Sequence, residues 1–193
     1  MRFIANRSSG KMGYALARAA VELGAQVTLV SGPSALRPPD GAAFIAVETT
    51  DQMHRAVERE FGRCDCLVMA AAPADFTPTK PVPSKIKKSA KGLSLSLRPT
   101  VDILASLAPR KRKQVVVGFA LETDNALANA RRKLRDKNLD LIVLNSPRDE
   151  GSAFGHDTNK VTLIRPGRKP ETWPLLPKSE IAVKLLEKIA SLL

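Results

Sequence analysis

The chain has 193 residues and carries 31 lysines and arginines against 19 aspartates and glutamates, so its formal net charge at pH 7 is +12. Apolar residues make up 44% and charged residues 26%, which is typical of a folded globular protein and excludes a largely disordered chain. No apolar run approaches the roughly 18 residues that a membrane-spanning helix needs, so we expect no membrane partner. The length predicts a single domain over residues 1–193, and the basicity indicates either nucleic acid or a small phosphate-rich ligand.

The first half of the chain alternates between helix and strand patterns. Apolar residues at helical spacing and short apolar runs give the two kinds of signal, and Gly24 marks the end of the first helix. The expected elements are a helix over 10–23, strands over 26–30 and 43–47, a helix over 50–61 and a strand over 64–71.

Cys64 and Cys66, the two cysteines, fall at the start of that last strand. On a strand their side chains would point to the same face, with too little room for an ordinary disulfide. The histidines, His54 and His156, have no spacing that completes a metal site with them. We expect buried free thiols and, because the N-terminus lacks a secretory-signal pattern, a cytoplasmic location.

Residues 72–91 interrupt the alternation. They contain four prolines and five lysines with little periodicity, which predicts a long lysine-rich loop away from the core. After it, Leu93, Leu95 and Leu97 alternate with serines, a pattern typical of a half-exposed strand.

The second half returns to alternating elements. We expect a helix over 102–108, a strand over 114–119, a helix over 123–138, a strand over 141–144, a hairpin of 161–164 with 171–175, and a last helix from Ser179. Three consecutive valines at 115–117 favour a parallel sheet covered on both faces. The repeated strand–helix–strand units predict an α/β fold, a three-layer Rossmann-like sandwich with a mostly parallel sheet and a small C-terminal hairpin.

Ligands of such sheets bind beyond the carboxyl ends of the strands, where several polar segments fall here. Residues 6–13, N-R-S-S-G-K-M-G, run into a helix start, where free N–H groups favour an anion. Their spacing matches neither a Walker A loop nor G-x-G-x-x-G. The alternative interpretation is a helix cap built from Ser8 or Ser9.

Two further segments lie after the buried strand that ends near Ala71. The alanines at 70–72 would let a flat group approach the backbone, and Asp75 could bind a ribose hydroxyl or a cation or simply form a turn. The four lysines of 85–91 could close over a polyphosphate or form a solvated surface.

The last candidates follow the valine strand. Phe119 could pack against a flat ring or within the core. Asn129, Lys133 and Lys137 lie at i, i+4 and i+8 of a helix and form either a cationic stripe or a solvated face, and Asn145 could orient its neighbours. No Ser-His-Asp or Cys-His arrangement accompanies them.

Taken together and in order, these segments resemble the phosphopantothenate–cysteine ligase family (phosphopantothenoylcysteine synthetase) of coenzyme A biosynthesis, over nearly the whole chain. The resemblance rests on residues 2–13, 30–33, 71–76, 85–88 (K-I-K-K), 118–123 and 137–140. It implies that CTP with Mg²⁺ converts 4′-phosphopantothenate into an acyl-cytidylate with release of pyrophosphate. L-Cysteine would then attack this intermediate and release CMP.

The resemblance also implies roles for individual residues. Lys85 and Asn6 would be catalytic, and Asp75 would be the candidate metal ligand. The CTP site would comprise Met69, Ala70, Ala71, Asp75, Lys85, Thr100, Val101, Asp102, Ile103, Phe119, Lys133 and Lys137. The acyl-cytidylate and substrate would contact Asn6, Ser8, Ser9 and Gly10. The family's N-P-D-I segment reads T-V-D-I at 100–103, and Pro73 replaces a small aliphatic residue.

Family membership implies a homodimer and, in many bacteria, fusion to a flavin-dependent decarboxylase domain. It also implies a strand and a threonine-containing loop before Met1, so we expect these 193 residues alone to be weakened or inactive. The alternatives are an inactive fragment, a basic nucleotide- or nucleic-acid-binding module, and a Rossmann oxidoreductase. Aromatic residues make up only 4% of the chain, which argues against a nucleic-acid partner, and the missing glycine fingerprint argues against the oxidoreductase.

Thirteen of the 31 basic residues fall in three clusters, 85–91, 110–113 and 131–137. The resemblance assigns residues of the first and third clusters to a triphosphate. We expect the cluster at 110–113 to be plain solvated surface.

Overall fold

The computed structural model describes residues 4–6, 8–82, 84, 86–87, 93–145 and 156–193. The helices are α1 (Lys11–Glu22), α2 (Thr50–Phe61), α3 (Ile103–Leu107), α4 (Ala126–Asp136) and α5 (Lys178–Ala190), with a 3₁₀ turn over Ala108–Arg110. The strands are β1 (Thr28–Ser31), β2 (Ala43–Ala46), β3 (Cys66–Met69), β4 (Phe76–Pro78), β5 (Leu97–Pro99), β6 (Val115–Leu121), β7 (Leu141–Asn145), β8 (Thr158–Asn159), β9 (Val161–Ile164), β10 (Glu171–Thr172) and β11 (Leu176–Pro177).

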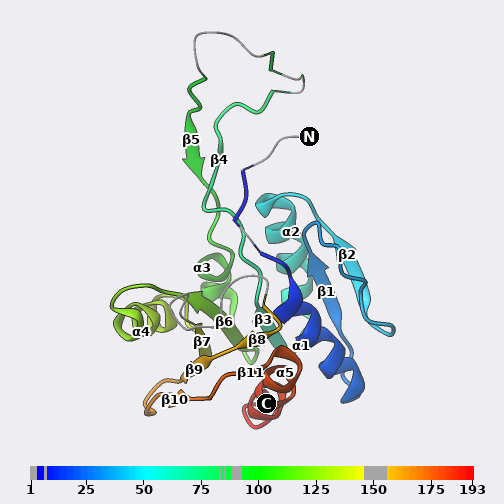
Figure 1. Cartoon of the computed structure of the whole chain (residues 1–193), viewed down its shortest axis with the longest axis vertical. Coiled ribbons are helices and arrows are strands. Elements are labelled where there is room, and N and C mark those ends of the chain that lie inside the picture. The colour runs from blue at the N-terminus through cyan, green and yellow to red at the C-terminus, as the bar shows by residue number, and fades with distance from the viewer. Residues whose placement is uncertain (1–3, 7, 83, 85, 88–92, 146–155) are drawn as a thin grey trace.

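The main sheet has the order β10-β9-β7-β6-β3. Strands β3, β6 and β7 are parallel, while β9 and β10 continue the sheet in antiparallel pairs (Figure 1). The parallel strands are joined by helices, because parallel neighbours need long crossovers. The predicted α/β fold with a mostly parallel sheet and a C-terminal hairpin is confirmed.

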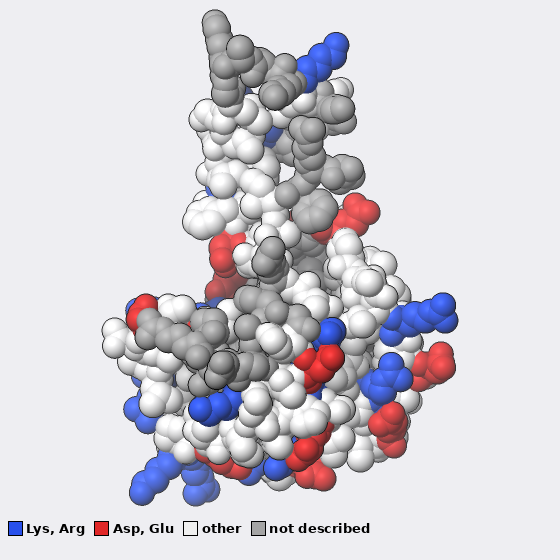
Figure 2. Space-filling view, viewed as in Figure 1, with Lys and Arg blue, Asp and Glu red and all other residues white. Residues whose placement is uncertain are grey.

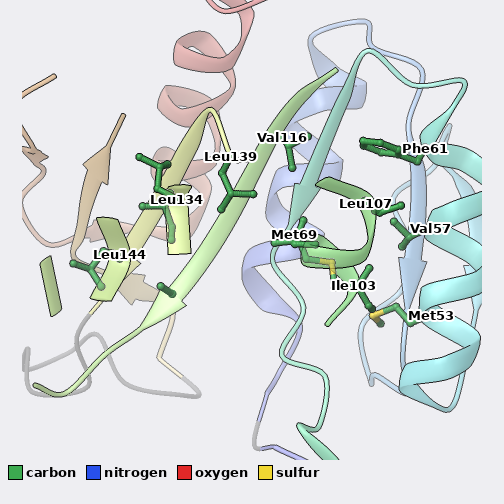
Figure 3. Packing of buried hydrophobic residues seen from close by; sticks show 14 of the residues in the cluster. Met53, Val57, Phe61, Met69, Ile103, Leu107, Val116, Leu134, Leu139 and Leu144 are labelled. Carbon is green, nitrogen blue, oxygen red and sulfur yellow. The ribbon is translucent and has the colours of Figure 1, made fainter. Parts of the chain in front are cut away.

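Two apolar clusters cover the two faces of this sheet. Alternate strand residues point to opposite sides, so Val116 and Ile142 pack beneath α2, α3 and α4, while Val117 and Val143 pack against α1 and α5. Figure 3 shows the first cluster, in which side chains of α2 and α3 meet Met69 at the end of β3. The three-layer arrangement places the carboxyl ends of β3, β6 and β7 along one edge, between the two helical layers.

The predicted single sheet is divided. Strands β1 and β2 form a separate parallel pair, and no ladder among the described residues joins this pair to β3. The apolar β3 residues 66–68 are only half-buried, whereas the matching residues of β6 are buried. One edge of β3 therefore lacks the neighbour that a fully covered parallel strand has.

The β4–β5 pair forms an arm that rises away from the body of the molecule, and described residues of the N-terminal segment lie beside its base (Figure 1). The strand predicted around Leu93, Leu95 and Leu97 is wrong in its bounds. Leu93 and Leu95 lie outside any strand and are exposed, and only Leu97 begins β5. Pairing with β4, and not the local alternation, decides where this strand forms.

The prediction for the cysteines is also corrected. Both are free thiols, but both are half-buried. Cys64 precedes β3 and packs beside the α2 cluster, whereas Cys66 packs beside the α1–α5 cluster, so they do not share a face. Burial, followed by the nearby Cys64, raises the pKa of the Cys66 thiol to about 12.

In the part of the chain that the structure describes, no helix is long and apolar enough to cross a membrane.

Candidate active site

A pocket lies at the carboxyl edge of β3, β6 and β7. Its lining includes backbone and side chains from the strand ends, from the start of α1, from α4 and from the segment before α3. Most of the predicted site residues line it: Asn6, Ser8, Ser9, Gly10, Met69, Ala70, Ala71, Asp75, Thr100, Val101, Asp102, Ile103, Phe119, Lys133 and Lys137. Residues as far apart in the sequence as Asn6 and Lys178 thus share one cavity wall. Lys11, which also lines the pocket, pairs with Asp157 at 2.7 Å.

The backbone carbonyls of residues 73–75, which follow β3 and line the pocket, accept hydrogen bonds from Asn6 and Thr100. The Asn6 side-chain amide donates to the Pro73 carbonyl at 2.9 Å. The Thr100 hydroxyl donates to the Ala74 carbonyl at 2.6 Å, and the Thr100 N–H donates to the Asp75 carbonyl at 2.9 Å. The threonine of the T-V-D-I segment thus holds the strand end, which leaves the exposed Asp75 carboxylate at the pocket.

On the α4 side, Lys133 is held by a carboxylate. Its Nζ lies 2.7 Å from Oε1 of Glu122, whose side chain is 14% exposed. The second oxygen of Glu122 accepts from the Asn129 amide at 3.2 Å. Asn129 of the predicted stripe therefore orients the partner of Lys133, a role that its helical spacing did not reveal.

Lys137, one residue beyond α4, pairs with Asp102 at 2.8 Å. Asp102 also caps α3, because its Oδ1 accepts from the Ala105 N–H at 3.1 Å. Burial alone would raise the pKa of Asp102, but the hydrogen bonds from Lys137 and Ala105 outweigh it and hold this pKa below its ordinary value. Asp102 therefore stays charged and fixes Lys137 at the pocket.

The start of α1 has no side-chain cap. Gly10 at the N-cap has φ of 72°, a left-handed conformation that a β-carbon would strain. The hydroxyls of Ser8 and Ser9 accept from the N–H groups of Gly10 and Lys11, at 3.4 and 3.5 Å. The alternative reading of the two serines as the helix cap is therefore wrong, and they line the pocket instead.

The pocket lining also includes Lys178, at the start of α5, and Asn159, neither of which was predicted as part of a binding site. Asn159 ends β8, and Lys178 follows β11. The pairing of these two short strands brings both residues to the pocket, and no local sequence pattern predicts this pairing. Glu122 lies outside the lining but holds Lys133, a role that the sequence did not predict. Glu122 could have been found from its place one residue after β6, at the same edge as the other candidates.

Lys85 lies outside the described residues, so its predicted catalytic role stays a prediction. The described residues contain no group of three metal-binding side chains. Asp75 is compatible with the expected Mg²⁺, because Mg²⁺ on a nucleotide takes one or two protein carboxylates and otherwise phosphate and water oxygens.

The described basic side chains outside the pocket do not form, on the face drawn in Figure 2, the continuous basic surface that a nucleic-acid-binding module would show. On the face drawn in Figure 2, acidic side chains are interspersed among the basic ones over the lower body. The cluster at 110–113 is not all plain surface: Lys111, with its side chain 10% exposed, pairs with Asp140 at 2.7 Å, and Arg110 pairs with Glu58. Lys111 therefore departs from the prediction of plain surface, whereas Arg110, Arg112 and Lys113 are exposed as predicted.

Comparisons with known proteins show which proteins this chain is similar to. The family model described as "DNA/pantothenate metabolism flavoprotein C-terminal domain" matches residues 1–193. A Bacillus subtilis protein named coenzyme A biosynthesis bifunctional protein CoaBC is 46% identical over 100% of this chain and 48% of its own length. A prokaryotic cysteine/cysteine sulfinic acid decarboxylase is 47% identical over 100% of this chain and 54% of its own length.

The chain thus spans about half the length of these relatives. Among solved structures, the C-terminal domain of a coenzyme A biosynthesis bifunctional protein CoaBC has a TM-score of 0.81 and 40% identity, covering 98% of this chain and 85% of that one. The match of the family model over all 193 residues shows that the chain belongs to the DNA/pantothenate metabolism flavoprotein C-terminal domain family.

Proposed function

We propose that the pocket is the active site of a ligase that joins 4′-phosphopantothenate to L-cysteine with CTP, in coenzyme A biosynthesis. The observation that carries this proposal is the pair Lys133 and Lys137, each fixed by a carboxylate and both lining the carboxyl edge of a parallel sheet. That edge is where α/β sheets bind nucleotides. The relatives named CoaBC, among them the Bacillus subtilis protein, supply the pathway.

The chemistry needs an activated carboxylate, because a free carboxylate is a poor acyl donor. An oxygen of the 4′-phosphopantothenate carboxylate attacks the α-phosphorus of CTP, and pyrophosphate leaves with the bonding electrons. The cysteine amine then attacks the acyl carbon of the resulting acyl-cytidylate and CMP leaves. Positioning and neutralisation of the phosphate charges supply much of the catalysis.

The described residues would divide these tasks. Lys133 and Lys137 would neutralise phosphate oxygens of the nucleotide, and the half-buried Phe119 would pack against a flat ring. Asn6, hydrogen-bonded to the strand end at Pro73, would contact the acyl-cytidylate. Mg²⁺, when bound with the nucleotide, would neutralise its phosphates, and Asp75 would be its protein ligand.

Three further expectations belong to this proposal. A flavin-dependent decarboxylase domain would accompany this one, in keeping with the word "bifunctional" in the relatives' names. The protein would be a homodimer, and it would act in the cytoplasm. Sedimentation at micromolar concentration tests the second of these expectations.

The test of the ligase is product formation with the chain in stoichiometric amounts, so that a single turnover can be detected. With CTP, Mg²⁺ and 4′-phosphopantothenate, mass spectrometry should detect the acyl-cytidylate, and added cysteine should convert it to 4′-phosphopantothenoylcysteine and CMP. The Lys85→Gln variant should yield less of the intermediate. Failure to bind either substrate at millimolar concentration would contradict the proposal, and equal yields would contradict the role of Lys85.

A further inference from the structure

The pocket has a second pair of lysines, on the other side of the sheet from Lys133 and Lys137. Lys11 is the first residue of α1 and Lys178 is the first residue of α5, and both line the pocket. Helices α1 and α5 pack together on the face opposite to α4. The pocket therefore has lysines on both sides of the sheet edge.

The two pairs differ in how their charge is balanced. Lys133 and Lys137 each have a carboxylate of their own, Glu122 and Asp102, at 2.7 and 2.8 Å. In the second pair, the Asp157 carboxylate, 2.7 Å from Lys11, attracts both ammonium groups. The Asp157 side chain is 87% exposed, so water screens much of its attraction.

Lys178 is partly removed from water at the pocket. It is half-buried, and its Nζ donates to the His156 carbonyl. Burial, followed by the charge of Lys11, lowers the pKa of Lys178, although Asp157 acts in the opposite direction. Two ammonium groups that repel one another in a partly desolvated pocket favour a bound anion of high charge, which would relieve both costs.

We propose that Lys11 and Lys178 bind the phosphomonoester of the acyl substrate, while Lys133 and Lys137 serve the nucleotide. The inference rests on the proposed function, because that reaction brings two separate phosphate-bearing molecules into one pocket. A dianionic phosphate accepts from both ammonium groups at once. Asn159, a buried polar residue that also lines the pocket, pairs in β8 with Leu176 of β11, two residues before Lys178.

The subsite predicts that the phosphate, and not the rest of the substrate, is recognised by this pair. Isothermal titration would compare 4′-phosphopantothenate, pantothenate and inorganic phosphate, binding to the unaltered chain and to the Lys11→Met/Lys178→Met double variant. Methionine keeps the length of the side chain and removes its charge. Lys169→Met, an exposed site between β9 and β10, is the matched control, and thermal melts show that each variant is folded.

We expect the unaltered chain and the control to bind 4′-phosphopantothenate at least tenfold more tightly than pantothenate. The double variant should lose this preference while its affinity for pantothenate is unchanged. If the double variant keeps the full preference, the subsite is wrong while the proposed ligase stands. If inorganic phosphate binds through the pair but neither acyl compound binds, the pair is an anion site but not the proposed phosphomonoester subsite, and the proposed function fails with it. If none of the three binds the unaltered chain, both are wrong.

Discussion

Asp102 links the pocket to the stability of the fold. It caps α3 and pairs with Lys137, and its pKa lies below its ordinary value. A carboxyl group with a depressed folded-state pKa stabilises the protein above its unfolded pKa, and this contribution disappears as the pH falls through the folded value. Residues 100–103 therefore hold a charge that serves both structure and site.

The Asp102→Asn variant tests this linkage, because asparagine can still cap the helix but carries no charge. The free energy of unfolding of the unaltered chain should exceed that of the variant above about pH 5, and the difference should shrink below about pH 3.9, the unperturbed pKa of aspartate. Urea denaturation at several pH values measures it. A difference that stays constant down to pH 2 would show that the charge contributes nothing.

At the residue scale, the sequence indicated where binding residues lie but not which of them cooperate. The helical spacing of Lys133 and Lys137 left a solvated face as the alternative, and the family resemblance assigned them to the nucleotide. The partners Glu122 and Asp102, and the second cation Lys178, depend on contacts between elements that no window of sequence contains. Distances through space, and not spacing along the chain, define these roles.

At the scale of elements, α2 was predicted to the residue because its signals are local. Thr49 and Gln52 form a capping box, in which the Thr49 hydroxyl accepts from the Gln52 N–H at 3.1 Å and the Gln52 side chain accepts from the Thr49 N–H at 3.2 Å. In contrast, α4 starts at Ala126, three residues later than predicted, because Asn125 adopts φ of 48°. Because Asn125 is in the left-handed region, the helix cannot include it or the residues before it, and α4 begins only at Ala126.

The capping box predicts the effect of a single substitution. Thr49→Ala should lower the free energy of unfolding by about 1 kcal/mol, because the Gln52 N–H at the start of α2 loses its acceptor. Chemical denaturation measures the change. Thr49→Ser keeps a hydroxyl at the same place and should restore most of the loss, and an equal loss in both variants would contradict the capping explanation.

The short helix α3 owes its stability to packing. Leu107 is 2% exposed and belongs to the cluster beneath α2, where Figure 3 shows it between α2 and β3. Leu107→Ala should cost about 2 to 5 kcal/mol in the free energy of unfolding, through lost burial and a residual cavity. Leu127→Ala, at a position that is 45% exposed, is the control and should change it by less than about 0.5 kcal/mol. Similar losses in the two variants would contradict this account.

At the scale of the whole molecule, the architecture was predictable and the division of the sheet was not. Periodicity identifies strands and crossovers, but it does not say which strand edges meet. The half-burial of β3 and its separation from β1 and β2 appear only in three dimensions. The net charge of +12 likewise says nothing about where the basic side chains lie. The structure places some of them at the pocket, some in ion pairs such as that of Lys111 with Asp140, and others on the exposed surface.

The central claim is that the carboxyl edge of the sheet binds CTP through Lys133 and Lys137. Isothermal titration of CTP with Mg²⁺ against the unaltered chain, the Lys133→Met/Lys137→Met double variant and the exposed Lys169→Met control tests it without requiring turnover. The account predicts at least a tenfold loss of CTP affinity in the double variant and no change in the control. Equal affinity in all three, in variants that remain folded, would contradict it.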